Sequence, residues 1–190
     1  MNKITDKKVL ILYGTRFGAT EEVAEKLKEM FEKKEIKTDI FDLKKVKNKN
    51  LPKINNYDGV VIGTGIKMSM WVKEVKNYLN KEKEKLKQYS GKKAFFISSA
   101  FAAQQERYDE IKKQYIIERI EKLGLEFQLI EAFGGKLDLS DNSRMGWLDK
   151  KIASVVAKEH EPDMKNNIVD FRDWKKVEKF ANDFIELIIA

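Results

Sequence analysis

The sequence predicts an α/β fold: a doubly wound, five-stranded parallel sheet in the order 2-1-3-4-5, with helices on both faces. Short apolar runs alternate with longer amphipathic segments along the chain, which is the pattern of successive strand–helix–strand units. The apolar runs are mostly continuous, as expected for strands that are buried on both sides. Because no linker, repeat or low-complexity tract interrupts the sequence, we expect residues 1–190 to form a single domain.

Five runs have the length and the apolar character of strands. They are Lys8–Tyr13, Lys37–Leu43, Gly59–Thr64, Lys93–Ser98 and Glu126–Phe133. Right-handed connections between parallel strands place the carboxyl ends of the first, third and fourth strands where the winding of the sheet reverses. Ligands of such sheets bind at this point. The loops that follow these three strands are therefore expected to carry the binding site.

The first expected helix follows the first strand directly. Its apolar residues recur at i, i+4, i+7 and i+8 and are Val23, Leu27, Met30 and Phe31. We expect Thr20 to cap this helix, and the acidic Glu21 and Glu22 suit its first turn. Three further helices are expected, at Trp71 to about Gln88, about Gln105 to Leu123 with Gly124 as its end, and Asp173 to Ile189.

The charge and residue inventory narrows the possible functions. Lys and Arg number 38 against 31 acidic residues, a net charge of +7. This excess is either a solvated helix surface or a surface for an acidic partner, an anionic substrate or an anionic membrane. No basic cluster interleaves with aromatic residues, so we expect no nucleic-acid partner.

The chain has no cysteine, which excludes disulfides, thiolate metal sites and cysteine nucleophiles. Its only histidine, His160, lies in a polar stretch and is expected to be exposed. We therefore expect no metal site and no catalytic acid–base residue of this kind. Met1–Lys8 has no apolar signal region and no run approaches the roughly 18 apolar residues of a membrane span. A cytoplasmic protein is expected.

The first loop, Thr15-Arg16-Phe17-Gly18-Ala19-Thr20, joins a strand to a helix. Backbone N–H groups and hydroxyls at the positive end of a helix bind phosphate well. The loop lacks the lysine of a triphosphate-binding loop and is not the glycine pattern of a dinucleotide site. Neutral donors around one interior glycine suit a monophosphate, and flavin mononucleotide (FMN) is the candidate. An ordinary strand-to-helix turn is the alternative, and Arg16 either adds charge near the phosphate or points to solvent.

The second loop runs from Gly63 to Trp71. Gly63 and Gly65 permit unusual φ values and a close approach to a planar ligand. Met68, Met70 and Trp71 offer surface for stacking on a flavin ring, or alternatively belong to the core of the next helix. A lysine at position 67 near the flavin would stabilise its reduced, anionic form and raise the redox potential.

The third loop, Ser98-Ser99-Ala100-Phe101-Ala102-Ala103-Gln104, offers small residues and hydroxyls for the polar edge of the ring. Phe101 either covers the second face of the ring or is buried. The candidate cofactor-binding residues of the three loops are Thr15, Arg16, Phe17, Gly18, Ala19, Thr20, Gly63, Thr64, Gly65, Ile66, Lys67, Met68, Trp71, Ser98, Ser99, Ala100, Phe101 and Ala102.

In this order and spacing, the three loops resemble the flavodoxin superfamily over essentially the whole chain. Within it, the chain is most similar to the menaquinone-dependent protoporphyrinogen IX dehydrogenase group. That likeness rests on Thr15–Thr20, on the third strand with the residues before it (Tyr57–Gly63), on Val169–Val177 with Phe180-Ala181, and on Trp147 and Asp149. The resemblance implies a flavodoxin-like fold, FMN, oxidation of protoporphyrinogen in haem synthesis, and a quinone or respiratory-chain acceptor.

One segment departs from that group. Where its members carry a basic, aromatic-rich insertion, this chain has the acidic and polar Leu137–Ser143. Met145–Lys158 then places Leu148, Ile152, Val155 and Val156 on one face, flanked by lysines. This segment is either an amphipathic helix that contacts a membrane or a partner peripherally, or a lid over the sheet edge. The role of residues 138–168 and the oligomeric state stay open.

Three functions follow from these observations. The first is an FMN-binding oxidoreductase or electron-transfer protein with a redox partner protein or a small-molecule substrate. Its basic surface favours a less negative potential than acidic shuttle flavodoxins have. The alternative is protoporphyrinogen IX dehydrogenase, whose substrate propionates would suit Lys67, Lys73 and Arg144. A flavin-free module of the response-regulator kind is disfavoured, because the first and third strands end in Tyr13-Gly14-Thr15 and Gly63-Thr64-Gly65 rather than in carboxylates.

Overall fold

Five parallel strands form the centre of the fold in the computed structural model, which describes residues 6–158 and 164–190. They are β1 (Lys8–Gly14), β2 (Lys37–Asp42), β3 (Gly59–Lys67), β5 (Lys92–Ser98) and β6 (Leu129–Phe133). Their order is β2-β1-β3-β5-β6, and every pair between neighbours is parallel. The predicted order 2-1-3-4-5 is thus confirmed, with small changes at the strand ends. His160 lies outside the described residues.

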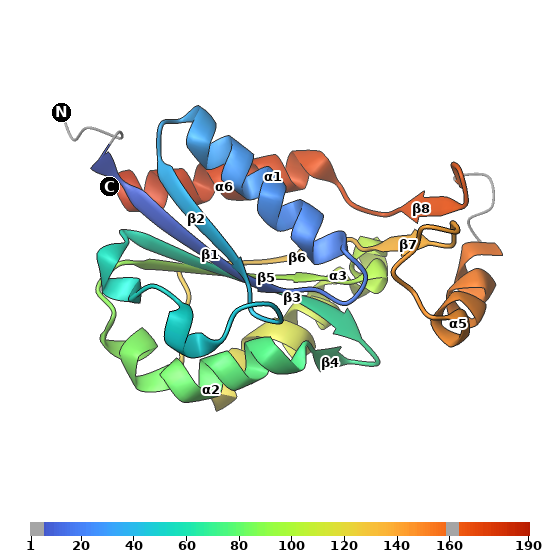
Figure 1. The fold of residues 1–190 in the computed structure, drawn as a ribbon, viewed down its shortest axis with the longest axis horizontal. Helices are drawn as coiled ribbons and strands as arrows, with labels where there is room; N and C mark the ends of the chain where they lie inside the picture. Colours follow the sequence, from blue (N-terminus) through green and yellow to red (C-terminus); the bar gives the residue numbers. More distant parts are fainter. Residues whose placement is uncertain (1–5, 159–163) are drawn as a thin grey trace.

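Helices cover both faces of this sheet (Figure 1). α1 (Ala19–Lys33) and α6 (Trp174–Ile189) pack on one face, while α2 (Lys73–Gln88) and the helical run α3–α4 pack on the other. Successive strand residues point to opposite faces, so Phe95 joins the α2 side of the core and Phe96 the α6 side. Asp173, which was predicted as the first residue of this helix, is its capping residue, because its carboxylate accepts from the N–H groups of Lys175 and Lys176.

The third helical segment is less regular than predicted. Short 3-10 turns at Ala100–Ala103 and Gln105–Arg107 precede α3 (Tyr108–Lys112), and a π-turn at Lys113–Ile117 separates it from α4 (Glu118–Lys122). Within the π-turn, the carbonyl of Tyr115 accepts a 2.7 Å hydrogen bond from the indole Nε1 of Trp71, which joins this segment to the β3–β4 hairpin. Gly124 follows the helix with φ +62°, as predicted for its end.

Two predicted helix starts are wrong. α2 begins at Lys73, because Met70–Trp71 forms a short strand, β4, that pairs antiparallel with the end of β3. Thr20 does not cap α1: it is the second residue of the helix, and the capping position is Gly18, whose φ of 100° is a backbone conformation that favours glycine. α1 therefore begins without a side-chain cap.

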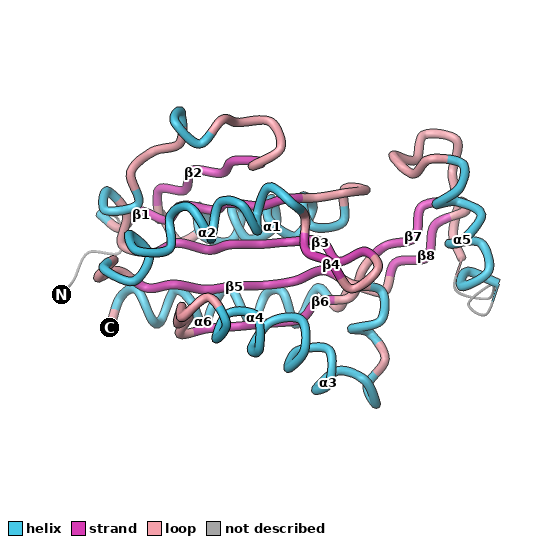
Figure 2. Tube along the Cα trace, turned by 90° about the horizontal axis from the view of Figure 1, so that it is seen from below, coloured by secondary structure: helices cyan, strands magenta, loops and turns pink. Residues whose placement is uncertain are grey.

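A second, two-stranded antiparallel sheet was not predicted. It consists of β7 (Lys136–Asp138) and β8 (Ile168–Asp170), and with α5 (Trp147–Lys158) it extends beyond the carboxyl edge of the main sheet. Figure 2 shows this extension at the same end as the β3–β4 hairpin, with the C-terminus at the opposite end. The residues where the three predicted loops meet lie between the main sheet and this extension.

The outward face of α5 is the apolar one. Ala153 and Ala157 are buried, whereas the larger Trp147, Leu148, Ile152 and Val155 are exposed. The alternative of a lid over the sheet edge is therefore wrong for Leu148, Ile152 and Val155, whereas the side chain of Val156 lies outside the described part of the structure. No described helix combines the length and the apolar character that a membrane span requires.

Candidate functional site

The three predicted loops meet in one cavity of about 130 Å³. From those loops it is lined by Thr15, Arg16, Phe17, Ala19, Thr20, Gly65, Ile66, Lys67, Ser98, Ser99 and Ala100. Gly18, Gly63, Thr64, Met68, Trp71, Phe101 and Ala102, also predicted, do not line it. The cavity lies at the switch point of the sheet, where β1, β3 and β5 end and where the ligands of such sheets bind.

The first loop, Thr15–Thr20, which was predicted to bind a phosphate and is called the phosphate loop below, is preorganised by its own residues. The hydroxyl of Thr15 accepts a 3.0 Å hydrogen bond from the N–H of Gly18, which fixes the turn before α1. Thr20 is 1% exposed and lines the cavity. Because no side chain caps α1, the first N–H groups of the helix are left for another acceptor. Two threonine hydroxyls and an uncapped helix N-terminus fit a phosphate group.

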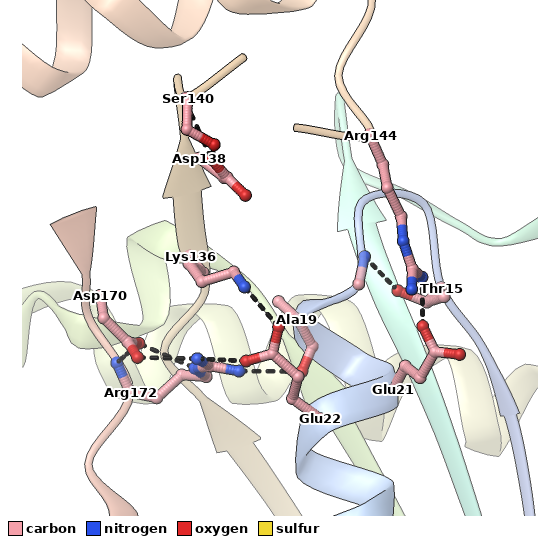
Figure 3. Close-up of polar contacts among 11 residues, drawn as sticks. Thr15, Ala19, Glu21, Glu22, Lys136, Asp138, Ser140, Arg144, Asp170 and Arg172 are labelled. Carbon is pink, nitrogen blue, oxygen red and sulfur yellow. Dashed lines mark hydrogen bonds and ion pairs between the residues drawn. The ribbon is translucent and has the colours of Figure 1, made fainter. Parts of the chain in front are cut away.

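Two acidic residues in the first turn of α1 would oppose an anion, but both are neutralised (Figure 3). The carboxylate of Glu21 pairs with Arg144 and with Lys45, the latter at 3.3 Å. Glu22 pairs with Lys136 and with Arg172, the latter at 2.7 Å. The loop therefore keeps the positive potential of the helix N-terminus.

Arg172 connects the extension to the phosphate loop. Its side chain is 2% exposed and donates to both carboxylate oxygens of Asp170 at 2.7 Å each. It also reaches Glu22 and, at 3.4 Å, the carbonyl of Ala19, which begins α1 (Figure 3). A buried, bidentate guanidinium of this kind fixes the relative position of its partners. β8 is thereby held against the start of α1.

Because of these ion pairs, the free energy of unfolding depends on pH in the acid range. Burial raises the pKa of Glu22, but hydrogen bonds and charges of Lys136 and Arg172 outweigh it, so the pKa lies below that of an ordinary glutamate. Burial also raises the pKa of Asp170, but hydrogen bonds and the charge of Arg172 lower it below that of an ordinary aspartate. Since the unfolded chain binds these protons more readily, stability is complete above the unfolded values and falls as pH drops through the folded ones.

We therefore expect the free energy of unfolding to decline below about pH 4.5. Urea unfolding of the wild type and of Glu22→Gln at several pH values between about 6 and 3 measures this. The variant should be less stable near neutral pH and should show a flatter decline. Equal slopes for both proteins would contradict the role assigned to Glu22.

The glycines of the second loop serve packing rather than unusual backbone angles. Neither Gly63 nor Gly65 has a positive φ, so that expectation is wrong. A Cβ on Gly63 would lie 2.2 Å from the ring of Phe96. Thr64 is committed to the loop itself, since its hydroxyl accepts from the N–H of Val72 at 3.0 Å and contacts the carbonyl of Gly65 at 3.2 Å.

The unusual backbone lies at the tip of the β3–β4 hairpin. Met68 and Ser69 have φ values of 47° and 60°, the signs required by a tight two-residue hairpin turn. Non-glycine residues in this region cost of order 1 kcal/mol each. The turn leaves the side chain of Met68 80% exposed, next in sequence to Lys67, which lines the cavity.

Lys67 is not an unpaired cation. Its ammonium group forms an ion pair of 2.5 Å with Asp149 of α5 and lies 5.4 Å from the centre of the Phe17 ring. The expectation that Lys67 offers a full positive charge to a flavin is thus modified by Asp149. The same contact fastens the start of α5 to the second loop.

In the third loop, Ser98 and Ser99 are buried, and the hydroxyl of Ser98 donates to the carbonyl of Gly134 at 3.1 Å. Phe101 is 47% exposed with the guanidinium of Arg107 5.0 Å from its ring centre, so the alternative of a buried Phe101 is wrong. Trp71 is 6% exposed, and the centre of its ring lies 5.0 Å from that of Phe95. Of the two predicted roles, stacking on a flavin or packing in the core, this agrees with packing in the core.

Four residues that line the cavity were missed: Gly135, Lys136, Leu137 and Met145. The consecutive glycines at 134 and 135, directly after the last strand of the main sheet, were a usable signal. A Cβ on Gly135 would lie 2.7 Å from the backbone nitrogen of Ala100, so glycine permits close approach to the third loop. Lys136 and Met145 come from the extension, whose strands had no clear pattern in the sequence.

The volume of about 130 Å³ is below the roughly 300–1,000 Å³ of typical ligand pockets. It suits a small anionic group such as a phosphate. A larger ligand has to continue toward the exposed Met68 and Phe101, or displace lining side chains such as those of Lys67 and Met145. The lining residues include three cations, Arg16, Lys67 and Lys136, and no carboxylate.

Comparison with known proteins agrees with this geometry. Residues 10–167 match the flavodoxin domain family. Protoporphyrinogen IX dehydrogenase [quinone] of Escherichia coli (strain K12) is 25% identical over 182 residues, which cover 95% of this chain and 96% of that protein. The protein of that name from Leishmania major is 24% identical over 186 residues, covering 96% and 77%. The solved structure of a mutant flavodoxin from Pseudomonas aeruginosa matches 80% of this chain and 95% of its own, with a TM-score of 0.50 and 13% identity.

Proposed function

The chain belongs to the flavodoxin domain family, and on this premise we propose that it is a flavin-binding redox protein with FMN as its cofactor. The observation that carries the proposal is the phosphate loop, in which two threonine hydroxyls, an uncapped helix N-terminus and neutralised acidic neighbours meet in one cavity. FMN supplies the electron-transfer chemistry, and the protein supplies its position and potential.

The proposed role of each residue follows from its position at the cavity. Thr15, Thr20 and the N–H groups from Gly18 onward bind the phosphate, with Arg16 as a neighbouring charge. The second and third loops, from Gly63 to Lys67 and from Ser98 to Ala102, approach the ring. Met68 and Phe101 are exposed and available to cover it. No catalytic acid–base residue is required.

We favour a dehydrogenase over a one-electron shuttle. Carboxylates around a flavin repel its reduced, anionic form and make the potential more negative, but none lines this cavity. Arg16, which forms no ion pair within the described residues, acts in the opposite direction. Lys67 and Lys136 do so only in part, because Asp149 and Glu22 pair with them. The electron donor or acceptor is then a small-molecule substrate or a redox partner protein.

A second candidate function is the oxidation of protoporphyrinogen IX in haem synthesis with a quinone acceptor. It is supported by the similarity to two dehydrogenases of that name over nearly the whole chain, at 24–25% identity. Of the cations expected near the substrate propionates, Lys67 and Arg144 are paired with Asp149 and Glu21, and Lys73 forms no ion pair within the described residues. A cytoplasmic location stays a prediction, and peripheral membrane contact is not borne out.

The proposal is tested by an anaerobic reductive titration of FMN-loaded protein, with visible absorbance recorded against potential. Reduction in one two-electron step at a mild potential supports a dehydrogenase. Two separate one-electron steps, the second at a very negative potential, identify a shuttle. If no flavin binds, the function is wrong and only the fold remains. For the second candidate, protoporphyrinogen added under anaerobic conditions should bleach the flavin and yield the fluorescent porphyrin.

The Lys67–Asp149 pair gives a sharper expectation. Asp149→Asn removes the charge that neutralises Lys67, so the reduced flavin anion is stabilised. We expect the potential to rise by about 50 mV, close to the 59 mV of a tenfold shift in a one-electron equilibrium. Asp141→Asn, which changes an exposed carboxylate of the same extension, should leave the potential unchanged. The double variant Lys67→Met/Asp149→Asn should return it toward wild type, and a rise that persists there would count against this explanation.

A further inference from the structure

A second cavity, of about 560 Å³, lies beside the flavin site between the start of α2, the β3–β4 hairpin and the end of α4. Its volume is within the range of small-molecule pockets. It shares only Arg16 with the phosphate cavity. An inference about this cavity therefore does not depend on flavin binding. Figure 1 shows β4 next to the beginning of α2, where two of its walls meet.

The lining combines an apolar floor with a ring of cations. Met70, Trp71 and Leu123 supply the apolar part, and Met70 is 58% exposed. Five cations surround it, namely Arg16, Lys73, Lys76, Arg119 and Lys122. No acidic residue is part of the lining. Two of the cations belong to α2 and two to the end of the α3–α4 run, so opposite walls carry the same charge.

Within residues 6–158 and 164–190, no ion pair neutralises these five cations. Thirteen Lys and Arg residues elsewhere in the described chain form ion pairs with carboxylates, and other lysines of that part are also unpaired, but these five line one cavity together. Like charges gathered without counterions repel each other, so an anion that enters the cavity gains electrostatic energy from both walls.

The two arginines of this cavity also lack a carboxylate partner for their guanidinium groups among the described residues. Arg16 donates to the carbonyl of Trp71 at 3.3 Å, but its Nε is buried and has no hydrogen-bond partner among the described residues. Arg119 donates to the backbone carbonyls of Ser69 and Gln114 and lies 5.8 Å from the Trp71 ring. Burial lowers the pKa of Arg119, which Tyr115 and Glu118 only partly offset. The hydrogen bonds that both side chains form with described residues go to backbone carbonyls, not to carboxylates.

We propose that this cavity is a second ligand site, which binds an amphipathic organic anion: an aromatic or other flat apolar body on Met70, Trp71 and Leu123, with a carboxylate held by the surrounding cations. The concave shape and apolar floor favour a small molecule over a purely inorganic anion. The positive charge of the five lining cations repels cationic ligands and adds little binding energy for neutral analogues. Arg16 connects the site to the phosphate loop.

The test is isothermal titration calorimetry of the full chain with saturating FMN, using 2-naphthylacetate and its neutral amide as matched probes. We expect the carboxylate to bind at least about tenfold more tightly than the amide. Only the carboxylate should weaken when salt is raised from about 50 to 500 mM. If FMN fails to bind, the proposed function is lost but this measurement can still be made on the same chain.

The variant Lys76→Gln/Lys122→Gln removes one charge from each wall. Both side chains are exposed and neither forms a side-chain hydrogen bond or an ion pair among the described residues, so folding should not change. We expect about tenfold weaker binding of the carboxylate and unchanged binding of the amide. The control, Lys34→Gln/Lys175→Gln, makes the same charge change at exposed positions on the opposite face of the sheet and should change affinity less than twofold.

Four results would overturn the proposal. They are equal affinity for the carboxylate and the amide, unchanged binding by the Lys76/Lys122 variant, loss of naphthylacetate binding when FMN is added, and tighter binding of hexaglutamate than of naphthylacetate. The third would place the ligand in the flavin cavity, and the fourth would make the surface a docking site for an acidic peptide.

Discussion

Replacing Thr15 and Thr20 together by valine is expected to raise the Kd for FMN by about 10²–10⁴-fold, since a hydrogen bond to a charged group contributes about 1.5–3 kcal/mol. Valine keeps the shape of threonine but removes the hydroxyl. Thr20 lies in the wall of the cavity, and Thr15 also holds the N–H of Gly18. Fluorescence titration of the purified variant with FMN measures the change.

Riboflavin provides the control for this variant, because it has the same ring system without the phosphate. Its affinity should be nearly the same in the wild type and in Thr15→Val/Thr20→Val. A parallel loss for riboflavin would mean that the loop contacts the ring or that the fold is disturbed. Circular dichroism and urea unfolding of the variant distinguish these two cases.

Replacing Arg172 by methionine is expected to lower the free energy of unfolding by about 2–4 kcal/mol. Removing one partner of a buried ion pair typically costs about 3–5 kcal/mol, and the partial exposure of Glu22 and Asp170 reduces this. Methionine retains much of the side-chain volume next to the Trp174 ring, which lies 4.5 Å from the guanidinium. The loss is therefore mainly electrostatic, and urea unfolding at neutral pH measures it.

Two further variants separate charge from geometry at Arg172. Arg172→Lys keeps the charge but cannot donate to both oxygens of Asp170 in one plane, so it should recover only part of the stability. Adding Asp170→Asn to Arg172→Met should restore some stability, because it removes an unpaired carboxylate. A loss below about 0.5 kcal/mol for Arg172→Met, the size of an ordinary surface substitution, would contradict the structural role of this network.

The main sheet and its loops could be predicted because their signals are local. A buried parallel strand shows itself as an apolar run, and Gly124 and Asp173 mark helix ends through their own backbone and side-chain chemistry. The order of the strands follows from the handedness of their connections. For the same reason, the meeting of the first, second and third loops at one cavity could be expected before any contact was known.

The helix of the extension showed an amphipathic pattern, but its two strands could not be predicted, because they have three residues each and show no period. The role of the extension comes from pairs that are distant in the sequence: Lys67 and Asp149 are 82 positions apart, and Lys136 and Glu22 are 114 apart. Spacing alone does not identify such partners. This is why Lys67 was expected to be an unpaired cation, and why Lys136 was missed.

The backbone of the second loop was mispredicted for a related reason. Glycine has two uses, positive φ angles and close packing, and the sequence does not distinguish them. At Gly63 the ring of Phe96 leaves no room for a Cβ, so packing is the reason. The positive φ values lie instead at Met68 and Ser69, which short-range propensity would not select for a tight turn.

The most direct measurement of the central claim is a titration of the flavin-free wild-type protein with FMN and, separately, with riboflavin. If the phosphate loop is the anchor of the cofactor, FMN binds at least about 100-fold more tightly than riboflavin, as two or more hydrogen bonds to a charged phosphate would require. Equal affinities for the two flavins, or no binding of either, would contradict the assignment of Thr15–Thr20 as a phosphate site.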